Sequence, residues 1–373
     1  MHLRWICASA CLLAGIVQAA TGGASSDATA PPAPFRAPYT PASDATVLQA
    51  VPAAADPKVR EMRALRRALS ANPKDPENAV RLSRAYVDFG RKIGDAHYAG
   101  YAQAVIDPWL GSKAVPVPVP VSVLVMHGVI LQYQHKFDAA RAELQRAVKH
   151  DPGNLQSWLT LSSIDLLQGD TAAAAHDCAS IGLSEFAIVC TATVRASSGQ
   201  AEQARRLLML VQRQSASLPP SVQAWIDGLI AETSGQLSDW QTQETYLRKA
   251  LAHAPGDDFL LVSYADFLLD RGRPKEVLPL LSAQSQSDTA FLRIALAQEA
   301  LNSPQRARYA WIMTARFEAL ALRDTALYDR EHSRFVLHVL HDPDTALALA
   351  QGNWKTQRAA WDARVLLEAA LAA

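Results

Sequence analysis

The sequence carries an internal repeat, which constrains the fold more than any other feature. Residues 121–154 read as a helix, a turn, a second helix and a proline stop, and this plan recurs about 34 residues later. The matching positions of the second copy are Trp158, Leu161, Ser162, Gly169 and Ala174. Helix pairs with this period predict a solenoid. Because each unit of a solenoid contacts mainly its neighbours, the fold typically presents an extended surface for holding a partner.

Composition limits the fold class and the partners. Of the 373 residues, 49% are hydrophobic, and the strand formers Val and Ile show no sustained alternation with polar residues. We therefore expect an all-α chain. The 36 Lys and Arg residues balance 36 Asp and Glu residues. Without a basic excess, we expect no nucleic-acid partner.

The N-terminus has the features of a secretory signal peptide over residues 1–19. Residues 5–17 are apolar and uncharged, and Ala19 ends a small-residue cleavage site. The apolar run is too short for a membrane span, and no later run is long enough. We therefore predict export, with the periplasm as the destination. Cys11, which follows a run of small residues, leaves a lipoprotein as an alternative, and secretion beyond the envelope is another.

Three regions follow the signal peptide. Residues 20–55 are rich in Ala, Pro and Ser and carry little charge, so they cannot bury enough apolar surface to offset the entropy of ordering. We predict a flexible linker there. Helical periodicity begins at Asp56, and the predicted solenoid covers residues 56–321. In residues 322–373 helices persist without a clear repeat, which is expected of a terminal helical cap with a polar outer face.

Glycine and proline suggest where the first helices end. A helix that starts near Asp56 should stop at Asn72, and a second should run from Pro76 to Gly90. A third, over residues 95–106, should end before Pro108. Residues 113–120 alternate proline with valine and are predicted to form an extended crossing, because alternate prolines fix the backbone and remove donors.

The unit that starts at Val121 resembles the tetratricopeptide repeat. The residues that carry this resemblance are Leu124, Gly128, Leu131, Phe137, Ala140, Leu144, Ala147 and Pro152. His127 and, in the next unit, Asp165 depart from the pattern, and weaker copies extend the match over about residues 56–316. The resemblance implies an exported bacterial member of the family, folded as a right-handed superhelical solenoid of antiparallel helix pairs. It implies about six to seven repeats before the C-terminal helical cap.

Alternating small and large residues explain the pattern physically. A small residue on the first helix, such as Gly128 or Ser162, lets the second helix approach closely. Large residues such as Leu144, Trp158 and Trp311 are predicted to fill the gap to the next unit. Such units cannot bury their apolar faces alone, so they must stack.

Two cysteines remain after removal of the predicted signal peptide. Cys178 lies six residues before Ser184, and Cys190 lies six residues after it. If the turn between two antiparallel helices centres on Ser184, the cysteines face each other at a separation that suits a disulfide. An oxidising compartment permits the bond. Two buried thiols that pack as small apolar residues are the alternative.

Few groups of residues in the sequence have the composition of a catalytic or metal-binding site. The one metal-like group comprises His332, His338 and His341 with Glu331, Asp342 and Asp344. Its spacing matches no metal signature, so we interpret these as solvated residues near a helix end. The sequence has no nucleophile elbow, phosphate-binding glycine loop or zinc-protease motif. We therefore expect no enzyme, cofactor, metal or small-molecule substrate.

The family resemblance also implies a candidate binding groove, formed by the inner face of each first helix. The residues that map to it are Arg84, Asp88, Gln132, Tyr133, Gln156, Trp225, Glu232, Phe259, Asp266 and Asp270. Aromatic anchors beside polar residues are typical of a protein-binding surface. Clusters of Lys and Asn that would grip a peptide carboxylate are missing. The predicted function is a scaffold that binds a peptide or protein segment. The alternative is a structural component of an envelope complex, docked through its convex face or cap.

Overall fold

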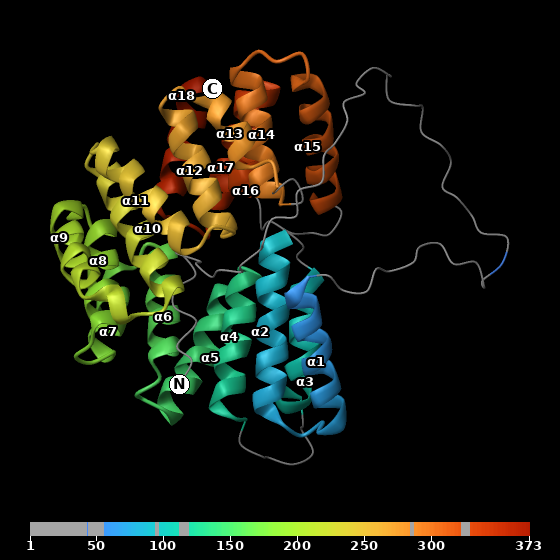
Figure 1. Cartoon of the computed structure of the whole chain (residues 1–373), viewed down its shortest axis with the longest axis vertical. Helices are drawn as coiled ribbons and strands as arrows, with labels where there is room; N and C mark the ends of the chain where they lie inside the picture. The colour runs from blue at the N-terminus through green and yellow to red at the C-terminus, as the bar shows by residue number, and fades with distance from the viewer. Residues whose placement is uncertain (1–42, 44–55, 94–96, 112–118, 284–286, 322–328) are drawn as a thin grey trace.

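The computed structural model describes residues 56–93, 97–111, 119–283, 287–321 and 329–373, together with Ser43 (Figure 1). The predicted signal peptide, the predicted linker apart from Ser43, and most of the proline–valine crossing lie outside the described residues.

Within these ranges the fold is all-α, as predicted, and consecutive helices form antiparallel pairs. Helix α1 (Pro57–Ala71) precedes the first pair. The first helices of the pairs are α2 (Pro76–Ile93), α4 (Val121–Tyr133), α6 (Leu155–Leu167), α8 (Glu185–Ser197), α10 (Pro220–Gln236), α12 (Asp258–Asp270) and α14 (Asp288–Ala300). Their second helices are α3 (His97–Leu110), α5 (Phe137–His150), α7 (Thr171–Ser180), α9 (Ala201–Arg213), α11 (Trp240–His253), α13 (Pro274–Leu280) and α15 (Arg306–Ala321). The chain finishes with α16 (Asp329–Phe335), a π-helical turn (Val336–Leu340), α17 (Pro343–Trp354) and α18 (Ala360–Ala372).

Two of the predicted helix ends are wrong. Helix α2 runs through Gly90 to Ile93, so this glycine does not end the helix. Helix α3 includes Pro108 in its last turn and ends at Leu110. A proline so close to the end disturbs only the final turn, and the Gly111 N–H still donates to the Asp107 carbonyl at 3.1 Å.

In the six pairs from α4 and α5 to α14 and α15, the turn inside the pair contains a residue in the left-handed region, which ends the first helix and reverses the chain. These residues, in chain order, are His135, Gly169, Gly199, Ser238, Gly272 and Asn302. They mark equivalent places in successive pairs, so positions on different first helices can be compared by counting back from them.

Close packing of the two helices in a pair explains the small residues of the repeat. A methyl group added at Gly128 would lie 2.6 Å from Cγ of Leu144, which is fully buried. The prediction that large residues fill the gaps holds for Leu144 but is wrong for Trp311, which is 60% exposed. Trp158 is partly buried, and its indole N–H donates to the Pro152 carbonyl at 2.8 Å.

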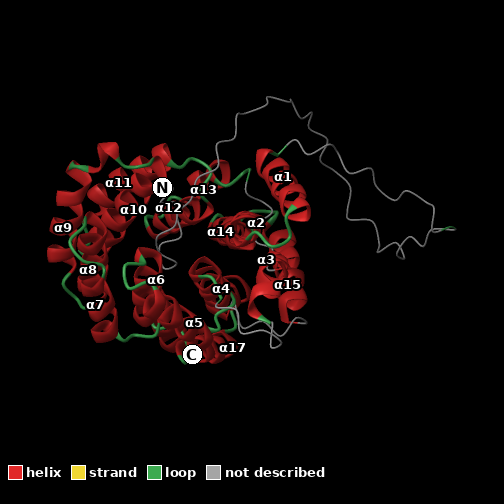
Figure 2. Ribbon diagram, turned by 90° about the horizontal axis from the view of Figure 1, so that it is seen from below, coloured by secondary structure: helices red, strands yellow, loops and turns green. Residues whose placement is uncertain are grey.

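The solenoid closes into a ring. In Figure 2 the helices follow a curved path around the molecule. The turn between α17 and α18 makes the contact: the Arg358 N–H donates to the Leu167 carbonyl at 2.6 Å, and the Gln357 amide lies 3.4 Å from Nδ1 of His135. The arginine side chain also passes Gly169 at 3.4 Å from where a Cβ would be. The last pair of helices therefore meets the Val121 and Leu155 units, which begin about 200 residues earlier.

The outer side of the last helix is not polar throughout, in contrast to the prediction for a cap. On α18, Leu367 is 62% exposed and Leu371 is 88% exposed. None of the helices in the described part of the chain combines the length and apolar character needed to cross a membrane.

Candidate functional site

The ring encloses a cavity, which we call the lumen. Its volume is about 2630 Å³, and it is bounded by the first helices of the pairs and by the helices α16 and α18. Pockets for small molecules measure about 300–1,000 Å³, so the lumen is too large for one such ligand to fill. All ten residues of the predicted groove line this one cavity.

The predicted aromatic residues differ in how much of the side chain is exposed to a ligand. Trp225 is 2% exposed and belongs to the hydrophobic core, whereas Phe259 is 41% exposed. The structure adds Trp240, which sequence reasoning missed. It lines the lumen at the start of α11, is 39% exposed, and stacks beneath the Arg271 guanidinium at 4.1 Å. Its position on a second helix, beside the turn, hid it from a search confined to first helices.

At the N-terminal wall of the lumen, a carboxylate lies among basic groups. Burial raises the pKa of Asp88 to about 7, although the positive charges of Arg91 and Arg84 act in the opposite direction. The Arg91 guanidinium also lies over the Tyr133 ring at 4.9 Å. This wall therefore combines cations, an aromatic ring and an acid that titrates near neutral pH. Gln132 lies beside it on α4 but is only 3% exposed.

At the opposite wall, a buried ion network connects α12 with the C-terminal helices. Asp266 accepts from Arg293 at 2.8 and 3.0 Å and from Arg334 at 2.9 Å. Glu331 pairs with the same two arginines. Burial alone would raise the pKa of Asp266, but the two guanidinium groups outweigh it and hold this pKa below its usual range. Arg293, Arg330 and Arg334 likewise outweigh burial and hold the pKa of Glu331 at about 2.

Asp270 is also paired. Its carboxylate accepts two hydrogen bonds of 2.7 Å from Arg364 on α18, and this guanidinium lies 4.9 Å from the centre of the Trp361 ring. Two predicted groove carboxylates, Asp266 and Asp270, thus join the solenoid to its own C-terminal helices. Sequence reasoning missed the arginines because they lie 27 to 94 residues away in the chain.

Glu232 contrasts with these carboxylates. It lies on α10, is exposed to the lumen, and has no hydrogen-bond or ion-pair partner among the described residues. The enclosing protein raises the pKa of its carboxyl by desolvation, and no neighbouring charge contributes to the shift. Gln236 lies one turn further along the same helix and is also exposed to the lumen. This part of the wall carries an unneutralised negative charge.

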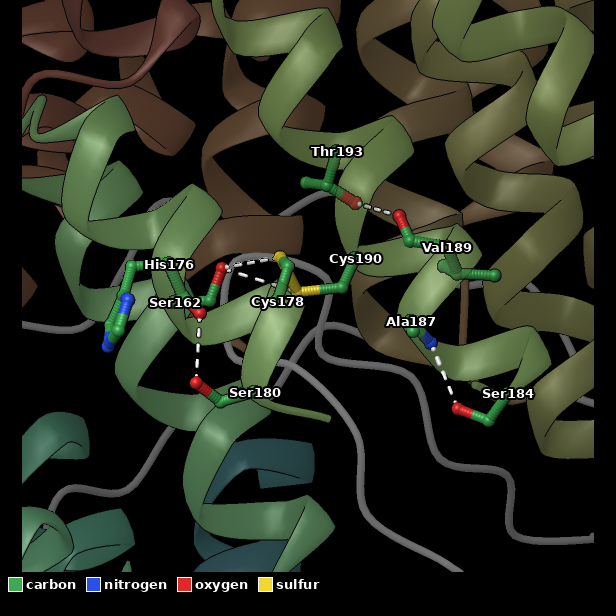
Figure 3. The surroundings of a disulfide bond; sticks show 9 residues. All are labelled: Ser162, His176, Cys178, Ser180, Ser184, Ala187, Val189, Cys190 and Thr193. Atoms are coloured by element: carbon green, nitrogen blue, oxygen red, sulfur yellow. Dashed lines mark hydrogen bonds between the residues drawn. A yellow bond between two sulfur atoms is a disulfide. The ribbon is translucent and has the colours of Figure 1, made fainter. Parts of the chain in front are cut away.

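The predicted disulfide is present in the structure. Cys178 on α7 and Cys190 on α8 are joined, with 5.5 Å between their Cα atoms (Figure 3). Ser184 caps α8 between them and accepts from the Ala187 N–H at 3.2 Å. The Ser162 hydroxyl lies 3.3 Å from the Cys178 sulfur and 3.4 Å from the Cys190 sulfur. The bond therefore ties two consecutive repeats together in the core.

Asp165, a departure from the repeat pattern, belongs to a buried polar cluster outside the lumen. It accepts from Nε of Arg141 at 3.1 Å. The neighbouring Asp177 is 7% exposed, and its Oδ2 has no hydrogen-bond partner in the structure as described. Burial, together with the charge of Asp165, raises the pKa of Asp177 to about 7. A shared proton between the two carboxyls would satisfy both.

The C-terminal histidines point to different partners. His332 stacks on Phe317 with 4.4 Å between ring centres. His338 lies 3.2 Å from a Glu368 oxygen, and His341 lies 3.6 Å from a Glu299 oxygen. Within the described ranges, no group of three or more His, Cys, Asp or Glu side chains could hold a metal ion.

Comparison with known proteins rests on structure alone. No protein-family model matches the sequence, and no curated protein matches it either. Solved structures of tetratricopeptide repeat proteins are similar in fold. The human IFIT1 dimer with PPP-AAAA has a TM-score of 0.51 at 13% sequence identity, covering 84% of this chain and 78% of that chain.

Two further structures match with lower TM-scores. A tetratricopeptide repeat protein from Parabacteroides merdae has a TM-score of 0.38 at 12% identity, covering 79% of this chain and 98% of that one. The Cut9–Hcn1 hetero-tetramer of APC/C has a TM-score of 0.42 at 12% identity over 84% of this chain, which matches 52% of the length of that chain. With its consecutive antiparallel helix pairs, the chain folds as a tetratricopeptide-like solenoid.

Proposed function

We propose that this protein is an exported, non-catalytic scaffold that holds an extended segment of a partner protein inside the lumen. The observation that carries the proposal is the convergence of all ten predicted groove residues on one cavity of about 2630 Å³. A cavity of this size exceeds the needs of a small molecule, and its exposed aromatic residues beside polar groups suit a polypeptide. The tetratricopeptide-like fold, typically non-catalytic, supports a scaffold in preference to an enzyme.

The charge of the lumen supports a polypeptide partner over a nucleic acid. Eleven Lys and Arg residues line it, but eleven Asp and Glu residues line it as well, and Arg293, Arg334 and Arg364 are paired with carboxylates of the same wall. A polyanion would need several cations free to contact its phosphates. The disulfide supports an oxidising compartment, and therefore export to the periplasm.

The alternative is permanent docking in an envelope complex through the outer surface. The exposed Leu367 and Leu371 on α18 favour it, because neighbouring exposed leucines are typical of a contact surface. These residues lie on the last helix, whereas Phe259 lies in the lumen.

Site-specific photocrosslinking in the native envelope distinguishes the two. A photoreactive phenylalanine analogue at position 259 reports on the lumen, and the same analogue at position 371 reports on the outer side of α18. Position 311 is the matched control, because Trp311 is an exposed aromatic residue that does not line the lumen. We expect one partner protein crosslinked from position 259 but not from 311. Crosslinks from position 371 alone would refute the lumen and support docking.

A further inference from the structure

The position of Glu232 in the repeat is equivalent to that of Asp266. Glu232 lies six residues before Ser238, and Asp266 lies six residues before Gly272. Ser238 and Gly272 are the left-handed residues that end α10 and α12. The two carboxylates therefore occupy the same place on consecutive first helices. In the four other pairs whose turn is described, this place holds Val129, Ser163, Thr193 and Leu296.

The chain itself shows what a carboxylate at this position binds. Asp266 receives the guanidinium of Arg293, which lies on the next first helix, nine residues before the left-handed Asn302. Counting back nine residues from Gly272 gives Ser263 as the corresponding residue for Glu232. A serine is too short to supply the missing cation, and its hydroxyl already donates to the Phe259 carbonyl at 2.8 Å.

Small residues leave room around Glu232. Gly228 lies one turn before it on α10 and lines the lumen, as does Ser263. The Gln243 side chain fills the space beside Gly235, one turn after it. Phe259, an exposed aromatic residue of the lumen, lies one turn before this serine on α12. An unneutralised carboxylate, space beside it and an aromatic face on the next helix make a site for a cation on an alkyl chain.

We propose that Glu232 binds an arginine or lysine side chain of the segment held in the lumen, in the place that Arg293 takes beside Asp266. This inference rests on the proposed function and adds the chemistry of the partner. The bound segment carries a basic residue with an extended backbone on either side. Its guanidinium or ammonium group donates to the Glu232 carboxylate, while its methylene groups pack towards Phe259.

Peptide selection tests the inference. A display library of random 12-residue peptides would be selected on the full chain, on Glu232→Gln and on Glu202→Gln. Glu202 also lines the lumen but is already paired with Arg205 and Arg206, so it is the matched control. We expect the wild type and Glu202→Gln to enrich Arg or Lys at one position of the selected peptides, and Glu232→Gln to lose that enrichment.

The outcomes separate this inference from the proposed function. If the wild type selects no peptide, the proposed function itself fails. If it selects peptides with no basic residue, or if Glu232→Gln selects the same basic residue, the lumen binds polypeptide but the role given to Glu232 is wrong. For one selected peptide, loss of a charged hydrogen bond should weaken binding to Glu232→Gln by about tenfold or more, and citrulline in place of arginine should do the same to the wild type.

Free amines test whether the cation bound by Glu232 belongs to a polypeptide or to a small molecule. Spermidine or arginine amide, at the concentration of the peptide, should not displace it from the wild type. The polypeptide ligand would be overturned if either amine bound the wild type as tightly as the peptide does and did not bind Glu232→Gln. The ligand would then be a small amine.

A variant that needs no ligand tests the geometry. Ser263→Arg should place a guanidinium beside Glu232, as Arg293 is placed beside Asp266. We expect it to raise the melting temperature and to abolish selection of basic peptides, with the thermal gain lost in the double variant Ser263→Arg/Glu232→Gln. An equal melting temperature with and without Glu232 would overturn the equivalence on which the proposal depends.

Discussion

Replacing Gly128 by alanine should destabilise the protein, although glycine is a poor helix former. The new methyl group would lie 2.6 Å from Cγ and 2.8 Å from Cδ2 of Leu144, well inside a normal carbon–carbon contact of about 3.5–4.0 Å. Overpacking of this kind costs about 1–3 kcal/mol. Alanine recovers about 1 kcal/mol of helix propensity. We therefore expect the free energy of unfolding to fall by up to about 2 kcal/mol, near the upper end because a fully buried leucine has little room to move.

Gly100 provides the matched control for this prediction. It lies inside α3, is exposed, and has nothing within 4 Å of an added Cβ. Gly100→Ala should therefore stabilise the protein by about 0.5–1 kcal/mol. Urea unfolding followed by circular dichroism at 25 °C measures both changes. If Gly128→Ala raises the unfolding midpoint as Gly100→Ala does, the close approach of α4 and α5 at Leu144 is refuted.

Three other predictions concern buried groups. Replacing Cys178 and Cys190 by serine should lower the free energy of unfolding by about 3 kcal/mol, the loop-closure value for so short a loop, measured by urea unfolding without reductant. Asp266→Asn should cost about 3–5 kcal/mol, because it leaves the buried guanidinium groups of Arg293 and Arg334 with Glu331 as the carboxylate that they still share, and Asp270→Asn at an exposed position should cost much less. The pKa of Asp177, raised from 3.8 to about 7, means that the folded state holds this proton more tightly than the unfolded state. The contribution of Asp177 to stability is then greatest below about pH 4 and is lost as the pH rises through about 7. Asp177→Asn should therefore stabilise the protein at pH 8 and have little effect at pH 4, and an equal effect at both pH values would contradict this.

Local pattern in the sequence predicts the helix pairs, the disulfide and the lumen-facing positions of the first helices. These features depend on residues close in the chain, such as Cys178 and Cys190 on either side of one turn. The pattern fails for Gly90 and Pro108, because neighbouring helices stabilise a helix beyond a residue that would weaken it alone. The pattern also predicts that Trp225 contacts a ligand, but this side chain is buried in the core and exposes little surface to one.

The arginine partners of Asp266 and Asp270 could not be predicted in the same way. Periodicity places both carboxylates on an inner face, but it does not show that the chain curves far enough to bring Arg334 and Arg364 to them. That curvature accumulates from small rotations between successive repeats, and no single unit encodes it.

Closure of the ring changes how the protein is expected to unfold. In an open solenoid, the free energy of unfolding is a sum of contributions from each repeat and from the contacts between neighbouring repeats, and the end repeats open first. Here the turn that carries Gln357 and Arg358 makes the C-terminal pair a neighbour of the units of His135 and Leu167. Loosening of the last helices should therefore reach these early units directly, without passing through the repeats between them. The contact also joins residues 222 positions apart, so the ring can form only late in folding, once the curved array exists.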